Sequence, residues 1–379
     1  MRAPSAAQAG RLAPTARTGR PARPPLDARS LDCMTTDPDR RRWLLASAML
    51  GLLPPMRPAH AARVADSAGR SLQVPARVER VFPAGPPAAI LLYTLAPDLL
   101  LGWPRANRPD ELEFLRPDIG RRPEVGRITG RGNSANLESV LALKPDLIVD
   151  SGSMRPTYVE LAERVQAQTG IAYALLDGRF AAIPDSYERL GVLVGRESRA
   201  RELADACADA MRTVTARVAQ VPLADRPRVY YARGPDGLQT GLGGSINTEI
   251  MTFMGLNLVG RELQGGLSTV SIEQVLAWDP DLIVTTDPSF AAEAGRMPAW
   301  RGVRAVRERR VHLSPRLPFG WIDFPPGVNR VPGLWWLGKT IFPQRFPEDL
   351  LDIARDFYRR FYGVEPSDAQ LRRVLAAPG

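Results

Sequence analysis

Cysteine and histidine are scarce in this chain of 379 residues, which has two of each. The cysteines are Cys33 and Cys207, and two thiols supply neither a disulfide framework nor a thiolate metal site. The histidines are His60 and His312, and His60 falls in the leader described below. A metal site of the usual His and Cys kind is therefore not expected, and we expect no cofactor.

Acidic charge is in deficit, because the formal net charge is +9. Residues 1–61 hold ten arginines and four aspartates, so +6 of this charge lies in the leader and +3 in the remainder. No run of basic residues interleaved with aromatic residues follows the leader. Such runs are typical of nucleic-acid binding, and we therefore expect no nucleic-acid partner.

The amino-terminal region carries the pattern of an export signal. Three arginines at residues 40–42 precede an apolar run from Trp43 to Leu53, and small residues stand at Ala59 and Ala61. This pattern is typical of a secretory signal peptide, and the run is too short to span a membrane. A buried core helix is the alternative, but prolines follow the run immediately. The arginines also resemble a twin-arginine signal. We expect a mature protein in the periplasm.

After the leader, short apolar runs alternate with helical patterns. Runs such as "PDLLLGWP", "PDLIVDSG" and "IAYALLDG" end in Gly, Asp or Pro, which is typical of buried parallel strands. A second series contains "RVYYARG", "PDLIVTTD" and "RRVHLSP", and the last of these places His312 within a strand. The sequence therefore predicts an α/β fold with parallel sheets.

A long amphipathic helix is predicted between the two series. From Glu197 to Gln220, apolar residues recur at steps of three and four, and Cys207 lies on this apolar stripe, where we expect a packing role. About 1.5 Å per residue gives a rod of roughly 33 Å. Ligands of open α/β sheets bind beyond the carboxyl ends of the strands, so we expect one cleft between two lobes. The predicted segments are a disordered or untranslated stretch 1–33, a signal peptide 34–61, an N-terminal α/β lobe 62–196, a connecting helix 197–221, and a C-terminal α/β lobe with terminal helices 222–379.

The chain carries nearly the same segment twice: "NLESVLALKPDLIV" begins at Asn136 and "SIEQVLAWDPDLIV" begins at Ser271. In each copy a capped helix, a proline and a buried strand build the fold, with Asn136 and Ser271 as the expected helix caps. Glu138 and Glu273 follow the caps by two residues. Each glutamate has two interpretations. One is stabilisation of the helix dipole by about 0.3–1 kcal/mol, and the other is an exposed carboxylate offered to arginines of a partner.

The two copies, together with "VADSAGRSLQVPARVERVFPAGPPAAILLYTLAPDLLLGW" and "RRVHLSPRLPFGWIDFPPGVNRVPGLWWLGKTIFP", resemble in order and spacing the periplasmic substrate-binding proteins of ABC importers for iron-siderophore complexes, haem and cobalamin. The resemblance runs from about Val64 to Tyr362. It implies two Rossmann-like lobes joined by one long helix that permits only small closure movements, and a monomer. It also implies that Glu138 and Glu273 dock into arginine pockets of a membrane permease.

The resemblance further places the ligand among loops at the strand ends, including the stretches 103–105 and 177–179. Arginines beside aromatic side chains suit an anionic chelate, because guanidinium groups pair with its oxygens while the rings cover its apolar surface. The expected ligand is a metal chelate, foremost a ferric siderophore, and the alternatives are cobalamin, haem, or a small chelate or oxyanion such as molybdate. The residues expected to contact it are Trp103, Arg127, Arg131, Arg179, Tyr231, Arg233, Phe290, Arg316, Phe319 and Trp321.

An enzyme resembling the metal chelatases is the rival interpretation. Such chemistry calls for a histidine, paired acids or cluster-binding cysteines in the cleft. After the predicted leader the sequence retains only His312 and Cys207, both within apolar patterns. Asp177, Asp287 and Asp323 stay as candidate acids, and we expect a binding protein without catalytic activity.

Overall fold

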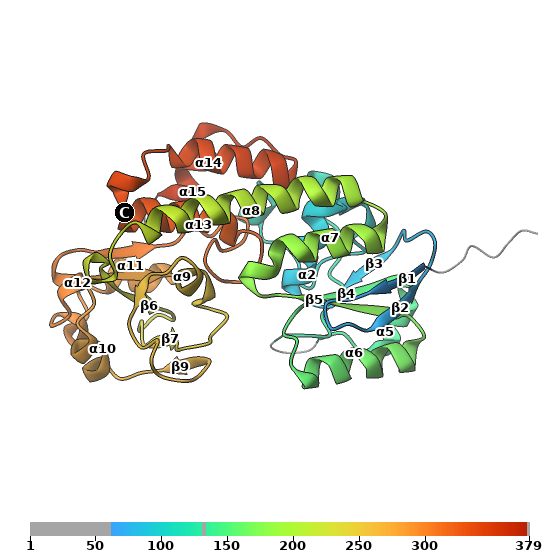
Figure 1. Ribbon diagram of the computed structural model, residues 1–379, viewed down its shortest axis with the longest axis horizontal. Helices are drawn as coiled ribbons and strands as arrows, with labels where there is room; N and C mark the ends of the chain where they lie inside the picture. The colour runs from blue at the N-terminus through green and yellow to red at the C-terminus, as the bar shows by residue number, and fades with distance from the viewer. Residues whose placement is uncertain (1–61, 131–133, 377–379) are drawn as a thin grey trace, which may run out of the picture. The chain divides into compact units, whose positions relative to one another are not determined.

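Two parallel sheets and one long helix organise the computed structural model, which describes residues 62–130 and 134–376 (Figure 1). The N-terminal sheet has the strand order β3-β4-β5, and the C-terminal sheet has the order β11-β10-β6-β8. Two antiparallel pairs, β1–β2 and β7–β9, accompany them. The predicted α/β class with parallel central sheets is confirmed.

The N-terminal lobe contains the first five strands. Its strands β4 and β5 pair in parallel from Leu147↔Ala172 to Gly152↔Asp177. The strand expected in 97–104 is present only as isolated parallel bridges, Val81↔Leu100 and Trp103↔Glu124. Local hydrogen bonds from Leu99 N to Ala96 O and from Leu100 N to Pro97 O form a turn of 3-10 helix at its beginning. The elements are β1 Ala62–Ala65, β2 Ser71–Val74, β3 Val81–Pro83, α2 Pro86–Leu95, η1 Pro97–Leu99, α3 Pro109–Leu112, α4 Pro117–Gly120, α5 Leu137–Ala142, β4 Leu147–Gly152, α6 Pro156–Thr169, β5 Ala172–Asp177, η2 Phe180–Ala182 and α7 Ile183–Val194.

The C-terminal lobe repeats the alternation of strands and helices. His312 lies in strand β11, as predicted. The elements are η3 Leu223–Asp225, β6 Arg228–Ala232, β7 Gln239–Gly241, α9 Glu249–Phe253, β8 Asn257–Leu258, β9 Leu267–Thr269, α10 Ile272–Trp278, β10 Leu282–Thr285, α11 Pro288–Glu293, η4 Pro298–Trp300, α12 Arg304–Arg307, β11 Val311–Leu313, α13 Arg330–Ile341, η5 Pro343–Arg345, α14 Leu350–Phe357, the π-helical segment η6 Tyr358–Tyr362 and α15 Asp368–Leu375.

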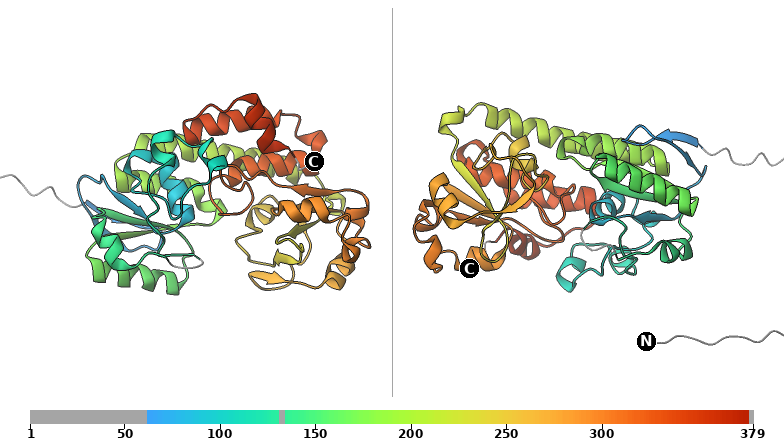
Figure 2. Two further views of the ribbon diagram at one scale, coloured as in Figure 1. Left: turned by 180° about the vertical axis from the view of Figure 1, so that it is seen from behind. Right: turned by 90° about the horizontal axis from the view of Figure 1, so that it is seen from below.

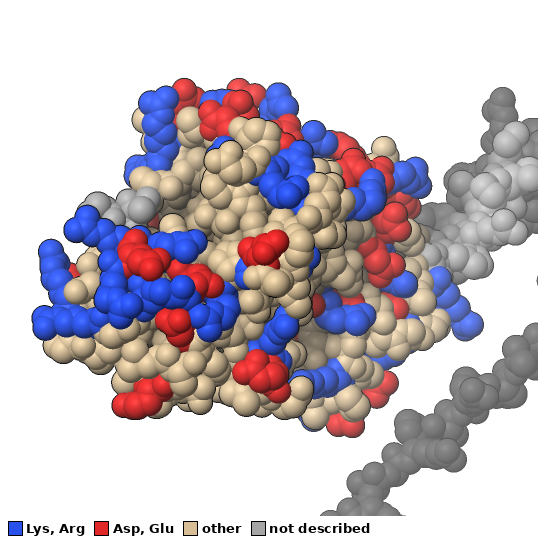
Figure 3. All heavy atoms as spheres, turned by 60° about the vertical axis from the view of Figure 1, so that its left-hand side comes forward, with Lys and Arg blue, Asp and Glu red and all other residues tan. Residues whose placement is uncertain are grey.

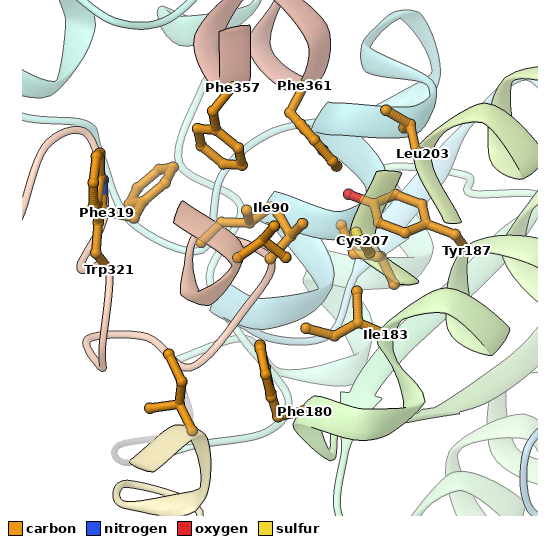
Figure 4. Close-up of a cluster of buried hydrophobic side chains, with 14 of the residues drawn as sticks. Ile90, Phe180, Ile183, Tyr187, Leu203, Cys207, Phe319, Trp321, Phe357 and Phe361 are labelled. Atoms are coloured by element: carbon orange, nitrogen blue, oxygen red, sulfur yellow. The ribbon is translucent and has the colours of Figure 1, made fainter. Parts of the chain in front are cut away.

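The connecting helix α8 runs from Glu197 to Ala219, so the predicted long helix is confirmed. Helix α7 of the N-terminal lobe and helix α13 near the carboxyl terminus both pack against it, as Figures 1 and 2 show. Cys207 is fully buried on its apolar stripe among side chains that include Tyr187 and Leu203 (Figure 4). Burial raises the pKa of the Cys207 thiol, which makes it unreactive.

The described residues form three hydrophobic clusters. The largest includes one face of each sheet, α8 and the terminal helices, and thus contains residues of both lobes. A second cluster lies around Val140 and Ile148 in the N-terminal lobe, and a third around Val275 and Ile283 in the C-terminal lobe. Each sheet is therefore covered on both faces, which explains why its strands read as continuous apolar runs.

A buried arginine joins the two lobes. Arg330 of α13 forms an ion pair with Glu249 of α9 at 3.1 Å and donates a hydrogen bond to Gly178 O, immediately after β5. Glu249 also accepts a hydrogen bond from Phe180 N, and the Arg330 guanidinium lies 5.0 Å from the Phe180 ring. The loop after β5 is thus fastened to the C-terminal lobe, where Phe253 also meets Phe180 edge-on. The junction is a packed and hydrogen-bonded contact.

The terminal helices, which the sequence assigned to the C-terminal lobe, also contact the N-terminal lobe. Tyr93 of α2 donates a hydrogen bond to Tyr362 O, and Arg373 of α15 pairs with Glu113. No helix among residues 62–130 and 134–376 is long and apolar enough to cross a membrane.

Candidate functional site

A pocket of about 580 Å³ opens between the two lobes, beyond the carboxyl ends of β3, β6 and β10. Both lobes line it, as expected for a ligand site on open parallel sheets. The lining residues are Pro86, Ala89, Ile90, Trp103, Pro104, Arg105, Asn107, Arg108, Glu111, Arg127, Gly234, Gln239, Thr286, Asp287, Pro288, Arg316, Pro318, Phe319, Gly320, Asp323, Phe324 and Pro325.

Two half-exposed arginines form the N-terminal wall of the pocket. Arg105 holds the carboxylate of Glu111 with both terminal nitrogens, at 2.8 Å and 2.6 Å. Arg108 approaches the same carboxylate at 3.1 Å, and its backbone N–H donates to it at 2.8 Å. The Glu111 side chain is only 1% exposed, against 48% for Arg105 and 55% for Arg108. Hydrogen bonding to Glu111 raises the pKa of Arg105. The buried carboxylate therefore fixes two cations at the pocket surface.

Aromatic rings form the floor. The Trp103 and Phe319 rings come from different lobes and lie with their centroids 5.8 Å apart. The Trp103 indole donates a hydrogen bond to Ile119 O, which satisfies its only donor and fixes the ring. This floor offers apolar surface to a ligand held between the lobes.

The C-terminal wall is built around the buried carboxylate of Asp323. Its Oδ2 accepts hydrogen bonds from the Tyr231 hydroxyl at 3.0 Å and from Asn247 Nδ2 at 2.8 Å. The Nε of Arg233 lies 3.3 Å from the same oxygen. Burial raises the pKa of Tyr231, so its phenol stays protonated and donates. Phe324 follows, and its ring lies 4.1 Å from the Arg233 guanidinium.

The structure brings four of the ten sequence-predicted contact residues to the pocket lining, namely Trp103, Arg127, Arg316 and Phe319. Whether they contact a ligand stays a prediction.

Five others do not line the pocket. Tyr231, Arg233 and Trp321 are buried behind its C-terminal wall. Phe290 packs against Trp300 in the core of the C-terminal lobe, where helix α11 carries it inward. Arg131 lies outside the described residues.

Arg179 also departs from the expectation. It points to solvent with a side chain 74% exposed and pairs with Asp177 at 2.5 Å. The stretch 177–179 was expected among the ligand loops, but its backbone is fastened to Arg330 and Glu249 of the other lobe. This loop therefore builds the lobe junction, an arrangement that local sequence cannot reveal because its partners lie far along the chain.

Sequence reasoning overlooked Arg108, Glu111 and Phe324. The segment "RANRPDELEF" did contain a signal, because a glutamate three residues after Arg108 is the position of a capping box. The structure shows one half of such a box, in which Arg108 N donates to the Glu111 carboxylate, while the arginine side chain has no acceptor to offer the helix. Phe324 had no such signal, since nothing local indicates that its ring faces a pocket.

Glu138 and Glu273 are both exposed in the first turns of α5 and α10. Asn136 accepts a hydrogen bond from Ser139 N, and Ser271 accepts one from Gln274 N, so both predicted caps are confirmed. Backbone and Ser271 hydrogen bonds hold the pKa of Glu273 below its usual value. In Figure 1 both helices lie below α8, α5 in one lobe and α10 in the other.

The surface beside α10 carries both signs of charge. Figure 3 shows basic and acidic side chains intermingled on the face where the C-terminal lobe comes forward. Arg228 and Arg304 each pair with Asp279 and Asp281 there. A continuous basic surface of the kind that tracks nucleic acid would not be interrupted in this way.

Comparison with known proteins identifies the family of this chain. The sequence model of a family described as periplasmic binding protein matches residues 125–316, about half of the chain. The chain belongs to this family. A solved structure of an ABC transporter solute binding protein from Sulfurospirillum deleyianum is similar, with a TM-score of 0.76 and 29% identity over 83% of this chain and 99% of that one.

Curated relatives support the same assignment. The molybdate-binding protein MolA of Haemophilus influenzae is 26% identical over 263 residues, which are 63% of this chain and 74% of the relative. The vitamin B12-binding protein of Vibrio parahaemolyticus is 25% identical over 249 residues, 65% of this chain and 84% of the relative. The protein is thus the extracytoplasmic binding component of an ABC importer, with the class III fold, and its partner is a membrane permease. Its relatives are transport proteins and not enzymes.

Proposed function

We propose that this binding protein captures an anionic metal chelate, foremost a ferric siderophore, and delivers it to its permease. The observation that carries the proposal is the lining of the pocket, where Arg105, Arg108, Arg127 and Arg316 surround an aromatic floor. Fixed guanidinium groups pair with carboxylate or catecholate oxygens, and rings cover the apolar parts of a chelator.

The charge balance of the lining supports an anion. Three carboxylates face the four arginines, and two of the three are already neutralised. Glu111 is paired with Arg105 and Arg108, and Asp323 with Arg233. The lining thus retains positive charge for a ligand, within a partly enclosed space where charge pairs are less screened than in water.

The size of the pocket favours a chelate over a bare ion. A volume of about 580 Å³ is that of sites for drug-sized ligands, and it is roughly twenty times the share of one water molecule. A free oxyanion is the second candidate, because the Haemophilus influenzae relative is named as molybdate-binding. Haem is less favoured, since the described lining contains no His, Tyr, Cys or Met to bind its iron.

Intrinsic tryptophan fluorescence tests the ligand directly, because Trp103 lies on the pocket floor. The purified protein is titrated with ferric enterobactin, ferric dicitrate, molybdate, cobalamin and haemin. We expect a saturable response to a ferric chelate with a dissociation constant below about 10 μM, which is roughly −7 kcal/mol. Tight binding of cobalamin alone would contradict the anionic chelate, and so would silence towards both ferric compounds.

We also propose that Glu138 and Glu273 dock the protein onto the permease. Both carboxylates are exposed on helices with the same cap geometry, which suits them to arginine pockets. Glu138→Ala with Glu273→Ala should abolish uptake in cells and leave ligand affinity unchanged. The matched control is Glu163→Ala with Glu308→Ala, which removes two exposed glutamates elsewhere. Normal uptake by the first double variant would rule out the docking role.

We further propose that residues 34–61 are a signal peptide that exports the protein to the periplasm. This segment lies outside the described residues, and the support is the sequence pattern and the extracytoplasmic class of the family. Fractionation of cells expressing the full chain should place the shortened mature protein in the periplasm. Replacing Arg41 and Arg42 by lysine should retain it in the cytoplasm if export uses the twin-arginine route.

A further inference from the structure

Phe324 occupies an unusual position at the rim of the pocket. Its side chain lines the pocket although the residue is 56% exposed, a large apolar surface to leave in contact with water. Its backbone has φ +64°, in the left-handed region that bulky residues rarely adopt. The N–H of Phe324 donates to Asp323 Oδ1 at 2.8 Å, which fixes the backbone at this point. The ring is thus held at the pocket surface by the chain beneath it.

The ring covers a buried arginine. The Arg233 guanidinium lies 4.1 Å from the centroid of the Phe324 ring, and its side chain is only 7% exposed. The Nε and Nη1 atoms of Arg233 have no hydrogen-bond partner among the described residues. The oxygen of Asp323 that faces Nε is 3.3 Å away, and it already accepts hydrogen bonds from Tyr231 and Asn247. A buried guanidinium with unused donors is costly unless an acceptor reaches it.

The sheet places a hydroxyl beside this arginine. Strands β6 and β10 are parallel neighbours whose pairing ends with Ala232 opposite Thr285, and Arg233 and Thr286 follow directly at the ends of these two strands. Thr286 lines the pocket, as does Gly234 next to Arg233. A guanidinium and a hydroxyl side by side are donors that suit one anionic oxygen group.

We propose that Phe324 is a gate over an oxyanion subsite formed by Arg233 and Thr286. The ring moves aside when an anionic oxygen of the ligand enters, and the cation–π contact is exchanged for charge-assisted hydrogen bonds. The group recognised is a carboxylate, a phenolate or an inorganic oxyanion. This inference rests on the proposed function. It makes displacement of the Phe324 ring the step that limits how fast an anion binds.

Stopped-flow tryptophan fluorescence tests the gate, with ferric dicitrate and sodium molybdate as probes. Phe324→Ala should raise the association rate constant several-fold, because no ring has to move before the anion reaches Arg233. The control Leu223→Ala removes another exposed apolar side chain, outside the pocket, and should leave the rate unchanged. An acceleration confined to ferric dicitrate identifies an oxygen of the chelate as the entering group, and one confined to molybdate identifies a free oxyanion.

Affinity tests the arginine. Arg233→Gln should weaken binding of the same probe by about tenfold or more, as expected for the loss of a hydrogen-bonded charge. Arg233→Lys keeps the positive charge opposite Asp323 and should lose less affinity. Thermal stability of both variants is measured as well, so that a damaged fold can be told apart from a damaged subsite. Arg189→Gln, on the exposed face of α7, is the matched control.

The outcomes separate the two proposals. If the wild-type protein binds ferric dicitrate, and both Phe324→Ala and Arg233→Gln match it in rate and affinity, the gated subsite is wrong while the proposed function stands. If the wild-type protein binds neither these two probes nor ferric enterobactin, the proposed function fails and the subsite fails with it.

Discussion

The two copies of the repeated segment, α5–β4 and α10–β10, have nearly the same local structure in different lobes. Each helix begins at a side-chain cap, Asn136 in one copy and Ser271 in the other, that accepts the N–H three residues later. Each also buries one valine completely, Val140 and Val275, beneath its own sheet. Two stretches about 135 positions apart thus use the same helix cap geometry and the same buried valine.

The likeness extends to the connection between helix and strand. Lys144 and Asp279 have left-handed backbones, with φ 47° and 41°. The following aspartates, Asp146 and Asp281, each donate a backbone hydrogen bond at 2.8 Å at the entry of the neighbouring strand, to Arg80 just before β3 and to Arg228 at the start of β6. Their carboxylates also accept the backbone N–H groups of the same two arginines. The repeated letters therefore encode a cap, a turn and a strand entry.

The copies diverge where the strands end. Asp150 in the first copy is buried, accepts hydrogen bonds from Thr129 and Tyr173, and has a pKa raised by burial. The matching residue of the second copy is Thr285, and the next two residues there line the pocket. The features that the two copies share, the cap, the turn and the strand entry, thus build the fold. The residues that differ at the strand ends form part of the pocket lining in one copy only.

The largest expected effect concerns the buried valines. Val140→Ala and Val275→Ala should each lower the free energy of unfolding by about 2 kcal/mol, because each leaves a small cavity in a packed cluster. Urea unfolding of the two variants measures it. A much smaller loss in one variant would show that the two copies are not equivalent in energy.

The strand-entry aspartates come next. Asp146→Ala and Asp281→Ala should each cost about 1.5–2 kcal/mol, because each removes a charged acceptor from backbone N–H groups. Asp281 also pairs with Arg304, so its variant should lose slightly more. The difference should shrink when Arg304→Gln is the background for both, and an undiminished difference would show that pairing with Arg304 does not explain it.

The helix caps should have effects of about 1 kcal/mol each. Asn136→Ala and Ser271→Ala leave a helix N–H without its side-chain acceptor. Because each cap also fixes the turn that carries Glu138 or Glu273, we expect uptake by cells to fall moderately while ligand affinity is retained. Asn136→Asp and Ser271→Thr, which preserve the acceptor, should restore stability. If uptake neither falls in the alanine variants nor recovers in the variants that preserve the acceptor, the caps play no part in docking.

The extent of sequence-based prediction follows the same division between local and distant contacts. The repeated segments, the long helix and the alternation of strands depend on local patterns, and they were predicted correctly apart from the strand expected in 97–104. The pocket walls depend on contacts between distant residues. Arg233 meets Asp323 and Phe324 across about ninety positions, and Arg330 meets the loop after β5 across about 150. Nothing local in these stretches indicates which arginine faces a ligand and which one fastens the lobes.

The smallest expected effect concerns the turns at Lys144 and Asp279. It tests whether two turns with similar φ angles also contribute similarly to stability. A left-handed backbone is costly for lysine and easier for aspartate, and glycine adopts it without strain. Lys144→Gly should therefore raise the free energy of unfolding, because glycine relieves the backbone strain and the exposed lysine side chain loses no packing. The gain should be only a few tenths of a kcal/mol, because glycine also gives the unfolded chain more conformational freedom.

Asp279→Gly should instead destabilise the protein, because Asp279 pairs with Arg228 and Arg304 and these partners are lost. Opposite signs in paired urea titrations would show that one backbone shape is held by different means in the two lobes: the chain tolerates strain at Lys144, whereas side-chain pairing compensates for it at Asp279. Equal gains in both variants would mean that the ion pairs beside α10 contribute no net stability, as is common for exposed pairs. The mixed charge on that face would then be available for contact with the permease.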